Sequence, residues 1–263
     1  MAPSEDVQEL RAPDGVRLRY TARRTGAQQV ILVVPGILNH RDGPAHRALA
    51  ERLSRVADVA TLDVRGHGDS EGTFSWGLKE PDDVAALAAS LRERYARVGG
   101  LGFSFGGFHT CVAAARHRCF DAVALVAAPA RLFLLDHAFL GRGLLRSLPL
   151  MLRRRRRPTR LLPVPLGRRD VPLGVVGRIA PVPLLVAHGS RDWLVPPKHA
   201  RRLHSRAGEP KELVLVEGGL HAEYMLEDDP EPLLGPLAGF FERWLSLTRA
   251  GAGGVIGPRQ EGG

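Results

Sequence analysis

The sequence predicts an α/β fold in which a mostly parallel sheet carries helices on both of its faces. Short runs rich in β-branched residues, such as 30–36, alternate along the chain with segments of helical periodicity. Several of these runs are apolar at almost every position, which is typical of strands buried on both faces of a parallel sheet. The length of 263 residues suits one large domain of this class.

The predicted elements follow one another in a regular order. Two strands within residues 7–24 are joined at Asp14-Gly15, a strong hairpin signal, and should form an antiparallel edge. The further strands are expected at 30–36, 59–64, 98–103, 121–128, 182–188 and 211–217. The helices are expected at 44–55, 81–95, 105–118, 196–207 and 232–247. Pro44 suits the first turn of its helix, and helix 81–95 has acidic residues first and basic residues last, as the helix dipole favours.

One segment, residues 131–178, interrupts this alternation. It lies between two predicted strands and is too long for a simple connection, so we expect a cap insertion over one end of the sheet. Because it holds 12 arginines and two aspartates, it accounts for the whole net charge of +9. The predicted organisation is therefore a core of 1–130 and 179–248, a basic cap, and a glycine-rich tail at 249–263 that we expect to be disordered.

The composition gives no signal for several function classes. The chain has no phosphate-binding glycine loop, dinucleotide fingerprint or zinc pattern, so we expect neither a cofactor nor a metal. The first residues lack a basic region followed by an apolar run, and no apolar stretch approaches the roughly 20 residues of a membrane span. We therefore expect a cytoplasmic protein, with Cys111 and Cys119 as buried free thiols.

The stretch LGFSFGGFHT, residues 101–110, places Ser104 between Gly102 and Gly106, directly after a strand and before a helix. Glycines two positions to either side of the serine suggest a backbone too tight for larger side chains. The pattern G-x-S-x-G in this context is typical of a sharp strand-to-helix turn that exposes a nucleophilic serine above the sheet.

Two further polar residues follow predicted strands. Asp192 lies in HGSRDWLVPP after strand 182–188, and His221 lies in GGLHAEYM after strand 211–217. Because active groups in open parallel sheets gather at the carboxyl ends of the strands, we expect both side chains to meet Ser104 there.

Four motifs, GFSFGG, DVRGHGDSEG, HGSRDWLVPP and GGLHAEYM, occur in the same order as in the α/β-hydrolase family, which this sequence resembles along nearly its whole length. The resemblance implies the α/β-hydrolase fold and a serine hydrolase of the esterase, lipase or serine aminopeptidase kind. Ser104 would be the nucleophile, His221 its base, and Asp192 the acid that fixes the histidine tautomer. A serine at this position excludes the relatives that use an aspartate nucleophile.

Such a site also needs backbone donors for the oxyanion. The resemblance points to the N–H of Phe105 and to an N–H in PGILNH, for which we choose Ile37, with Leu38 as the second choice. Many relatives have His-Gly where this chain has Pro35-Gly36, but the donor is a backbone group and does not depend on that histidine.

Four other polar residues near these motifs have structural interpretations. His67 and Asp69 are expected to brace their loop rather than to react, because such residues commonly bond to local backbone. His188 and Arg191 are expected to shape the loop that carries Asp192.

The expected activity is cleavage of a small to medium carboxylic ester with an apolar acyl chain, through an acyl-enzyme intermediate. A thioesterase or an aminopeptidase-like hydrolase would use the same triad. A non-catalytic binding module that uses the basic cap is the alternative from another class.

The run Arg153–Arg157 follows an apolar stretch of the predicted cap. It fits a solvated charge run, or a cationic lid that meets an anionic membrane surface. Nucleic acid is not an expected partner, because no aromatic residues interleave with the arginines. The sequence leaves the oligomeric state open.

Overall fold

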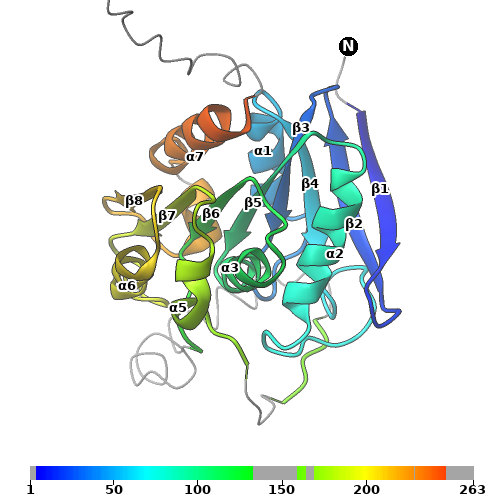
Figure 1. The fold of residues 1–263 in the computed structure, drawn as a ribbon, viewed down its shortest axis with the longest axis horizontal. Coiled ribbons are helices and arrows are strands. Elements are labelled where there is room, and N and C mark those ends of the chain that lie inside the picture. The colour runs from blue at the N-terminus through cyan, green and yellow to red at the C-terminus, as the bar shows by residue number, and fades with distance from the viewer. Residues whose placement is uncertain (1–3, 133–158, 164–168, 228, 247–263) are drawn as a thin grey trace, which may run out of the picture.

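The computed structural model describes residues 4–132, 159–163, 169–227 and 229–246. Its sheet has eight strands in the spatial order β1-β2-β4-β3-β5-β6-β7-β8 (Figure 1). Their bounds are β1 Ser4–Arg11, β2 Arg17–Arg24, β3 Gln29–Val34, β4 Asp58–Asp63, β5 Arg97–Phe103, β6 Ala122–Val126, β7 Leu184–Gly189 and β8 Lys211–Val216. Strand β2 runs antiparallel to β1 and β4, and all other pairs are parallel. The predicted mostly parallel sheet with an antiparallel edge is confirmed.

Helices cover both faces of this sheet, as the sequence predicts. Helices α1 and α7 pack together on one face, and α2, α3 and α6 contribute to the core on the other (Figure 1). The helix bounds are α1 Pro44–Leu53, α2 Glu80–Arg92, α3 Phe105–His117, α5 Pro172–Val175, α6 Lys198–Arg206 and α7 Glu231–Leu245, with 3-10 turns η3 Val176–Arg178 and η4 Ala222–Leu226. Among the residues that the structure describes, no helix has both the length and the apolar character to cross a membrane.

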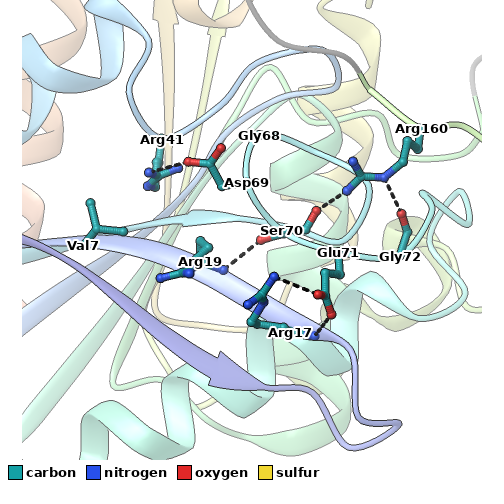
Figure 2. Close-up of a pocket in the computed structure, with 10 residues that line it drawn as sticks. All are labelled: Val7, Arg17, Arg19, Arg41, Gly68, Asp69, Ser70, Glu71, Gly72 and Arg160. Atoms are coloured by element: carbon teal, nitrogen blue, oxygen red, sulfur yellow. Dashed lines mark hydrogen bonds and ion pairs between the residues drawn. The ribbon is translucent and has the colours of Figure 1, made fainter.

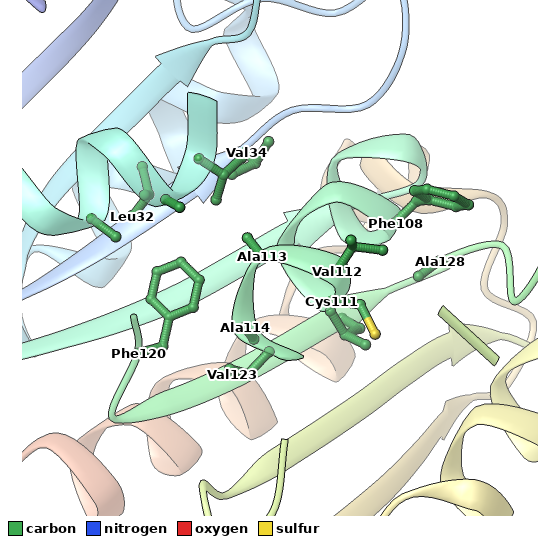
Figure 3. Packing of buried hydrophobic residues seen from close by; sticks show 14 of the residues in the cluster. Leu32, Val34, Phe108, Cys111, Val112, Ala113, Ala114, Phe120, Val123 and Ala128 are labelled. Atoms are coloured by element: carbon green, nitrogen blue, oxygen red, sulfur yellow. The ribbon is translucent and has the colours of Figure 1, made fainter. Parts of the chain in front are cut away.

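Strand β3 shows why its sequence is apolar at consecutive positions. Leu32 and Val34 belong to the core beneath α2 and α3, whereas Ile31 and Val33 belong to the core beneath α1 and α7. Because side chains alternate across a strand, burial on both faces requires apolar residues without a gap. Figure 3 shows Leu32 and Val34 facing the same core as Val112 and Phe120.

The two cysteines lie in the α3 region, and both are buried and free, as expected. Burial raises the pKa of the Cys119 thiol to about 12, and it also raises the pKa of Cys111. Both side chains therefore act as small apolar groups in the core.

Element ends differ from the predicted ones by a few residues. The helix predicted at 81–95 ends at Arg92, and just beyond it the backbone tightens, since Glu93 N–H donates to Ser90 O over 3.3 Å and Arg94 N–H to Leu91 O over 3.0 Å, each three residues earlier. The Tyr95 hydroxyl then donates to the Asp58 carboxylate over 2.9 Å. This contact joins the segment after α2 to the start of β4, and helical periodicity in the sequence does not predict it.

Parts of the predicted cap, 131–178, are described, and they pack on the core. Arg160 N–H donates to Gly66 O and Arg160 O accepts from Phe74 N–H, each over 2.8 Å. Val175 and Val176 are buried in the same core as α3. The arginine run at 153–157 and the tail at 249–263 lie outside the described residues.

The turn from β5 into α3 leaves no room for a side chain at two of its glycines. A Cβ atom placed on Gly102 would lie 2.5 Å from Gly106 O, and one placed on Gly106 would lie 2.0 Å from Val34 O. Both neighbours are backbone atoms of the sheet and helix, so they cannot move aside as a flexible side chain could. The two glycines of the motif therefore allow α3 to start directly against β3 and β5.

We predict that Gly106→Ala destabilises the protein by about 1–3 kcal/mol or more, because the added methyl overlaps Val34 O. Urea unfolding followed by circular dichroism measures the change. Gly239→Ala is the matched control, since a Cβ atom there meets nothing within 4 Å on helix α7 and no proline follows. Alanine in a helix is favoured over glycine by about 1 kcal/mol, so the control should be at least as stable as the native chain. An unfolding midpoint for Gly106→Ala equal to that of the native chain would contradict the prediction.

Candidate active site

Ser104 occupies the turn between β5 and α3 in a backbone conformation that is rare for serine. Its φ is 49° and its ψ is −119°, which places it in the left-handed region that costs non-glycine residues about 1–3 kcal/mol. Two backbone hydrogen bonds hold it there: Ser104 N–H donates to Val126 O over 2.8 Å, and Ser104 O accepts from Phe108 N–H over 3.1 Å. The strain is thus maintained by the sheet on one side and by α3 on the other.

The three residues singled out by the sequence lie together. Ser104 Oγ is 2.9 Å from His221 Nε2, and His221 Nδ1 is 2.7 Å from Asp192 Oδ2. They come from the ends of β5, β8 and β7, and all three are buried. Because an ionised carboxylate only accepts hydrogen bonds, His221 Nδ1 carries the proton and Nε2 is left to accept from the serine hydroxyl.

Asp192 is fixed by more than the histidine. Its Oδ1 accepts from the backbone N–H groups of Leu194 and Val195 over 2.9 and 2.8 Å. Its Oδ2 lies 3.1 Å from His188 Nε2, which is also 2.7 Å from Val195 O. Arg191 N–H donates to Gly219 O over 2.9 Å and so joins the Asp192 loop to the His221 loop. His188 and Arg191 therefore shape the acid loop, as expected.

The interaction between Asp192 and His221 shifts the pKa of both groups. Burial raises the pKa of Asp192, but the charge of His221 and the hydrogen bonds from His188 and His221 outweigh it and hold the pKa below its usual range. Burial lowers the pKa of His221, but the charge and hydrogen bond of Asp192 more than offset this, and the pKa is raised. The arrangement favours a charged aspartate and a histidine that readily takes up a proton.

The β3–α1 loop, residues 35–43, passes next to Ser104. Gly36 N–H donates to Glu223 Oε1 over 2.8 Å, and Leu38 N–H donates to His67 Nε2 over 3.3 Å. No residue in the described part of the chain accepts a hydrogen bond from Ile37 N–H, which lies between these two anchored groups. The second choice from the sequence, Leu38, has its N–H engaged, so Ile37 stays the better candidate for an oxyanion donor beside Phe105 at the start of α3.

His67 and Asp69 brace their loop, as expected from the sequence. His67 Nδ1 is 3.2 Å from Arg65 O, and burial lowers the pKa of His67. The imidazole is therefore neutral, donates through Nδ1 and accepts the Leu38 N–H through Nε2. Asp69 accepts from Arg41 Nη2 over 2.9 Å.

One contact between two residues at this site was not predicted from the sequence. Glu223 and His46 are both buried, and His46 Nε2 is 3.3 Å from Glu223 Oε1. His46 lies on α1 and Glu223 on η4, with 176 intervening positions in the chain. The only sequence signal is an acidic residue two positions after His221, and this spacing has no specific meaning by itself.

A large cavity among the described residues lies away from this site. It has a volume of about 790 Å³ and borders β2 and the loop after β4, with lining residues Val7, Arg17, Arg19, Arg41, Gly68, Asp69, Ser70, Glu71, Gly72 and Arg160. Figure 2 shows that Arg17 pairs with Glu71 and Arg41 with Asp69. Its lining includes none of Ser104, Asp192 and His221, and its arginines largely have carboxylate partners, so we do not assign the reaction to it.

Within the described residues, no group of three or more His, Cys, Asp or Glu side chains is arranged to hold a metal ion. The polar groups around Ser104 are instead paired with one another in hydrogen bonds.

Comparisons with known proteins agree with this architecture. The chain is 26% identical to the uncharacterized protein YfhR of Escherichia coli K12, over 84% of this chain and 74% of that protein. Its fold matches that of the esterase Pf2001 of Pyrococcus furiosus with a TM-score of 0.73 at 20% identity, covering 93% of this chain and 94% of that one. It also matches Est1E of Butyrivibrio proteoclasticus, solved with ferulic acid bound, with a TM-score of 0.63 at 17% identity, covering 90% and 97%. The sequence model of the alpha/beta hydrolase fold matches residues 29–171, which is more than half of the chain, and the protein therefore belongs to this family.

Proposed function

We propose that the protein is a serine hydrolase that cleaves carboxylic esters through an acyl-enzyme intermediate. The observation that carries this proposal is the buried chain of hydrogen bonds from Ser104 Oγ through His221 to Asp192, with distances of 2.9 and 2.7 Å. A serine hydroxyl is a weak nucleophile, and an adjacent base oriented by a carboxylate is the usual means of activating it.

In the first half of the reaction, Ser104 Oγ attacks the ester carbonyl carbon while its proton moves to His221 Nε2. The tetrahedral intermediate collapses, the bond to the leaving oxygen breaks, and His221 returns the proton to the alcohol. In the second half, water attacks the acyl-enzyme, His221 takes the water proton, and Ser104 leaves with it. Asp192 keeps the proton on Nδ1 throughout and stabilises the imidazolium that forms twice.

The negative oxygen of each tetrahedral intermediate would accept hydrogen bonds from the N–H groups of Phe105 and Ile37. The anchoring of Gly36 and Leu38 on either side supports this role for Ile37, because a pre-oriented donor does not have to reorganise during the reaction. Phe105 begins α3, where the helix dipole also favours negative charge.

Two observations support an ester with an apolar acyl group. Trp76 is partly exposed and meets the ring of Phe105, the residue after the nucleophile, edge-on at a centroid distance of 5.8 Å. Two relatives of similar fold are named as an esterase and as a protein that binds ferulic acid. Thioester or amide hydrolysis would use the same triad, and parallel assays with matched esters, thioesters and aminoacyl amides decide among these substrates.

We predict that Ser104→Ala lowers ester hydrolysis by about 10⁴-fold or more and abolishes labelling by a fluorophosphonate probe, because the nucleophile is gone. Ser205→Ala, at an exposed serine on α6, is the control and should keep full activity and labelling. Circular dichroism checks that both variants are folded. Persistent labelling of the folded Ser104→Ala protein would refute the assignment, and an unlabelled native protein would favour the non-catalytic binding module.

We predict that Asp192→Asn lowers kcat by about 10⁴-fold while the fold is kept, because the amide leaves His221 in the wrong tautomer. Asp170→Asn is the matched control, since Asp170 is a partly exposed carboxylate that pairs with Arg116 Nε over 2.7 Å, and its kcat should be unchanged. Steady-state kinetics with a p-nitrophenyl ester measures both. Near-native turnover by Asp192→Asn would place the acid at another residue.

We predict that kcat/KM rises with pH along a limb whose midpoint lies above 6.5, the ordinary value for histidine. The sign follows because a protonated His221 cannot accept the Ser104 proton, and because Asp192 raises the pKa of this histidine. Initial rates across a pH series, within the range where circular dichroism is constant, give the midpoint. A midpoint below the ordinary value would contradict the geometry described for this pair.

A further inference from the structure

Glu223 lies at the point where the β3–α1 loop meets the nucleophile. Its side chain is 4% exposed, and Oε1 accepts the Gly36 N–H over 2.8 Å. A Cβ atom placed on Gly36 would lie 3.0 Å from Glu223 Oε1 and 3.2 Å from Ser104 Cβ. The carboxylate, the loop and the serine are therefore packed against one another, and glycine is the residue that fits between them.

This contact completes a clamp on the β3–α1 loop. Glu223 holds Gly36 from the side of η4, and His67 holds Leu38 from the loop after β4. Ile37 lies between the two anchored residues, so the direction of its N–H depends on both. A shift of Gly36 would turn the peptide plane that presents this N–H to the substrate.

The charge of Glu223 is a separate contribution, because a neutral carbonyl oxygen would accept the same hydrogen bond. Burial raises the pKa of Glu223, but the His46 ring, whose Nε2 lies 3.3 Å from Oε1, together with the Gly36 N–H lowers it below its usual value. The group is therefore a carboxylate near neutral pH. A buried charge of this kind acts strongly on its neighbours, since little water screens it.

His221 lies two residues before Glu223, where η4 begins. The groups around this histidine are Asp192 from the loop after β7, Ser104 from the β5–α3 turn and Glu223 from η4. His188 acts on it through Asp192, and His46 of α1 acts through Glu223. Burial lowers the pKa of His221, Asp192 raises it most, and the charge of Glu223 raises it further.

We propose that Glu223 is a positioning residue with two separable roles: Oε1 orients the β3–α1 loop for oxyanion binding, and its buried negative charge, two residues from His221, stabilises the imidazolium that forms during the reaction. The proposal rests on the function proposed above. It adds a second carboxylate–histidine pair, Glu223–His46, on the side of Ser104 where the β3–α1 loop lies.

The two roles are separated by two substitutions. Glu223→Gln keeps a carbonyl oxygen for Gly36 N–H and removes the charge, whereas Glu223→Ala removes both. Glu217→Gln is the matched control, because Glu217 is an exposed carboxylate of the same loop. The readouts are the pH dependence of kcat and kcat/KM with p-nitrophenyl butyrate, and the NMR titration of the His221 imidazole, which needs no turnover.

For Glu223→Gln we expect kcat on the high-pH plateau within about threefold of the native value. We also expect the midpoint of the acid limb of the kcat/KM profile and the midpoint of the His221 NMR titration to move to lower pH by about half a unit or more. For Glu223→Ala we expect the same displacement and a further loss of kcat of about tenfold or more, since an oxyanion donor is misplaced. Glu217→Gln should leave both midpoints unchanged, because solvent screens an exposed charge.

An unmoved His221 titration in Glu223→Gln overturns the electrostatic role, and equal kcat losses in the Gln and Ala variants overturn the orienting role. If Glu223→Ala does not fold, the pH profile and NMR titration of Glu223→Gln decide. If the native protein neither hydrolyses esters nor reacts with the fluorophosphonate, the proposed function fails. The His221 titration then still tests the influence of Glu223 on this histidine.

Discussion

The close approach of α3 to strands β3 and β5 is the constraint on which the site depends. Gly102 and Gly106 have no room for a Cβ atom, and Ser104 between them is forced to a positive φ of 49°. This conformation directs the hydroxyl toward the edge where the loops after β7 and β8 end. The strain at Ser104 persists because the sheet and the helix both hydrogen-bond to its backbone, and so the surrounding fold maintains it.

The electrostatics of the site follow from burial combined with selected partners. Burial alone would neutralise Asp192 and Glu223, yet each is kept charged by a histidine and by backbone N–H groups. At His67 burial prevails, and the neutral imidazole can accept the N–H of Leu38. The pKa of His221 is therefore raised and that of His67 is lowered. The difference is that a carboxylate is hydrogen-bonded to the His221 ring, whereas the His67 ring bonds to backbone groups.

The fold was largely predictable because its signals are local and repeated. Apolar runs that lack alternation indicated buried parallel strands, and Asp14-Gly15 indicated the antiparallel edge. Ser104, Asp192 and His221 could be named because each follows a strand whose carboxyl end lies at one edge of the sheet. The contact between Glu223 and His46 could not be predicted, because a contact between η4 and α1 produces no periodic pattern in the sequence.

By itself, the sequence determined the class of the fold, the order of its elements and the residue types available at the strand ends, since these follow from periodicity and from glycine at a tight turn. Only the tertiary structure decided that Ile37 rather than Leu38 has a backbone N–H without an acceptor among the described residues, that Tyr95 beyond helix α2 donates to Asp58, and that Glu223 contacts Gly36. The physical reason is that these outcomes depend on hydrogen bonds between segments distant in the chain. Such bonds can form only after the fold has brought both partners together, and burial then makes an unpaired partner costly.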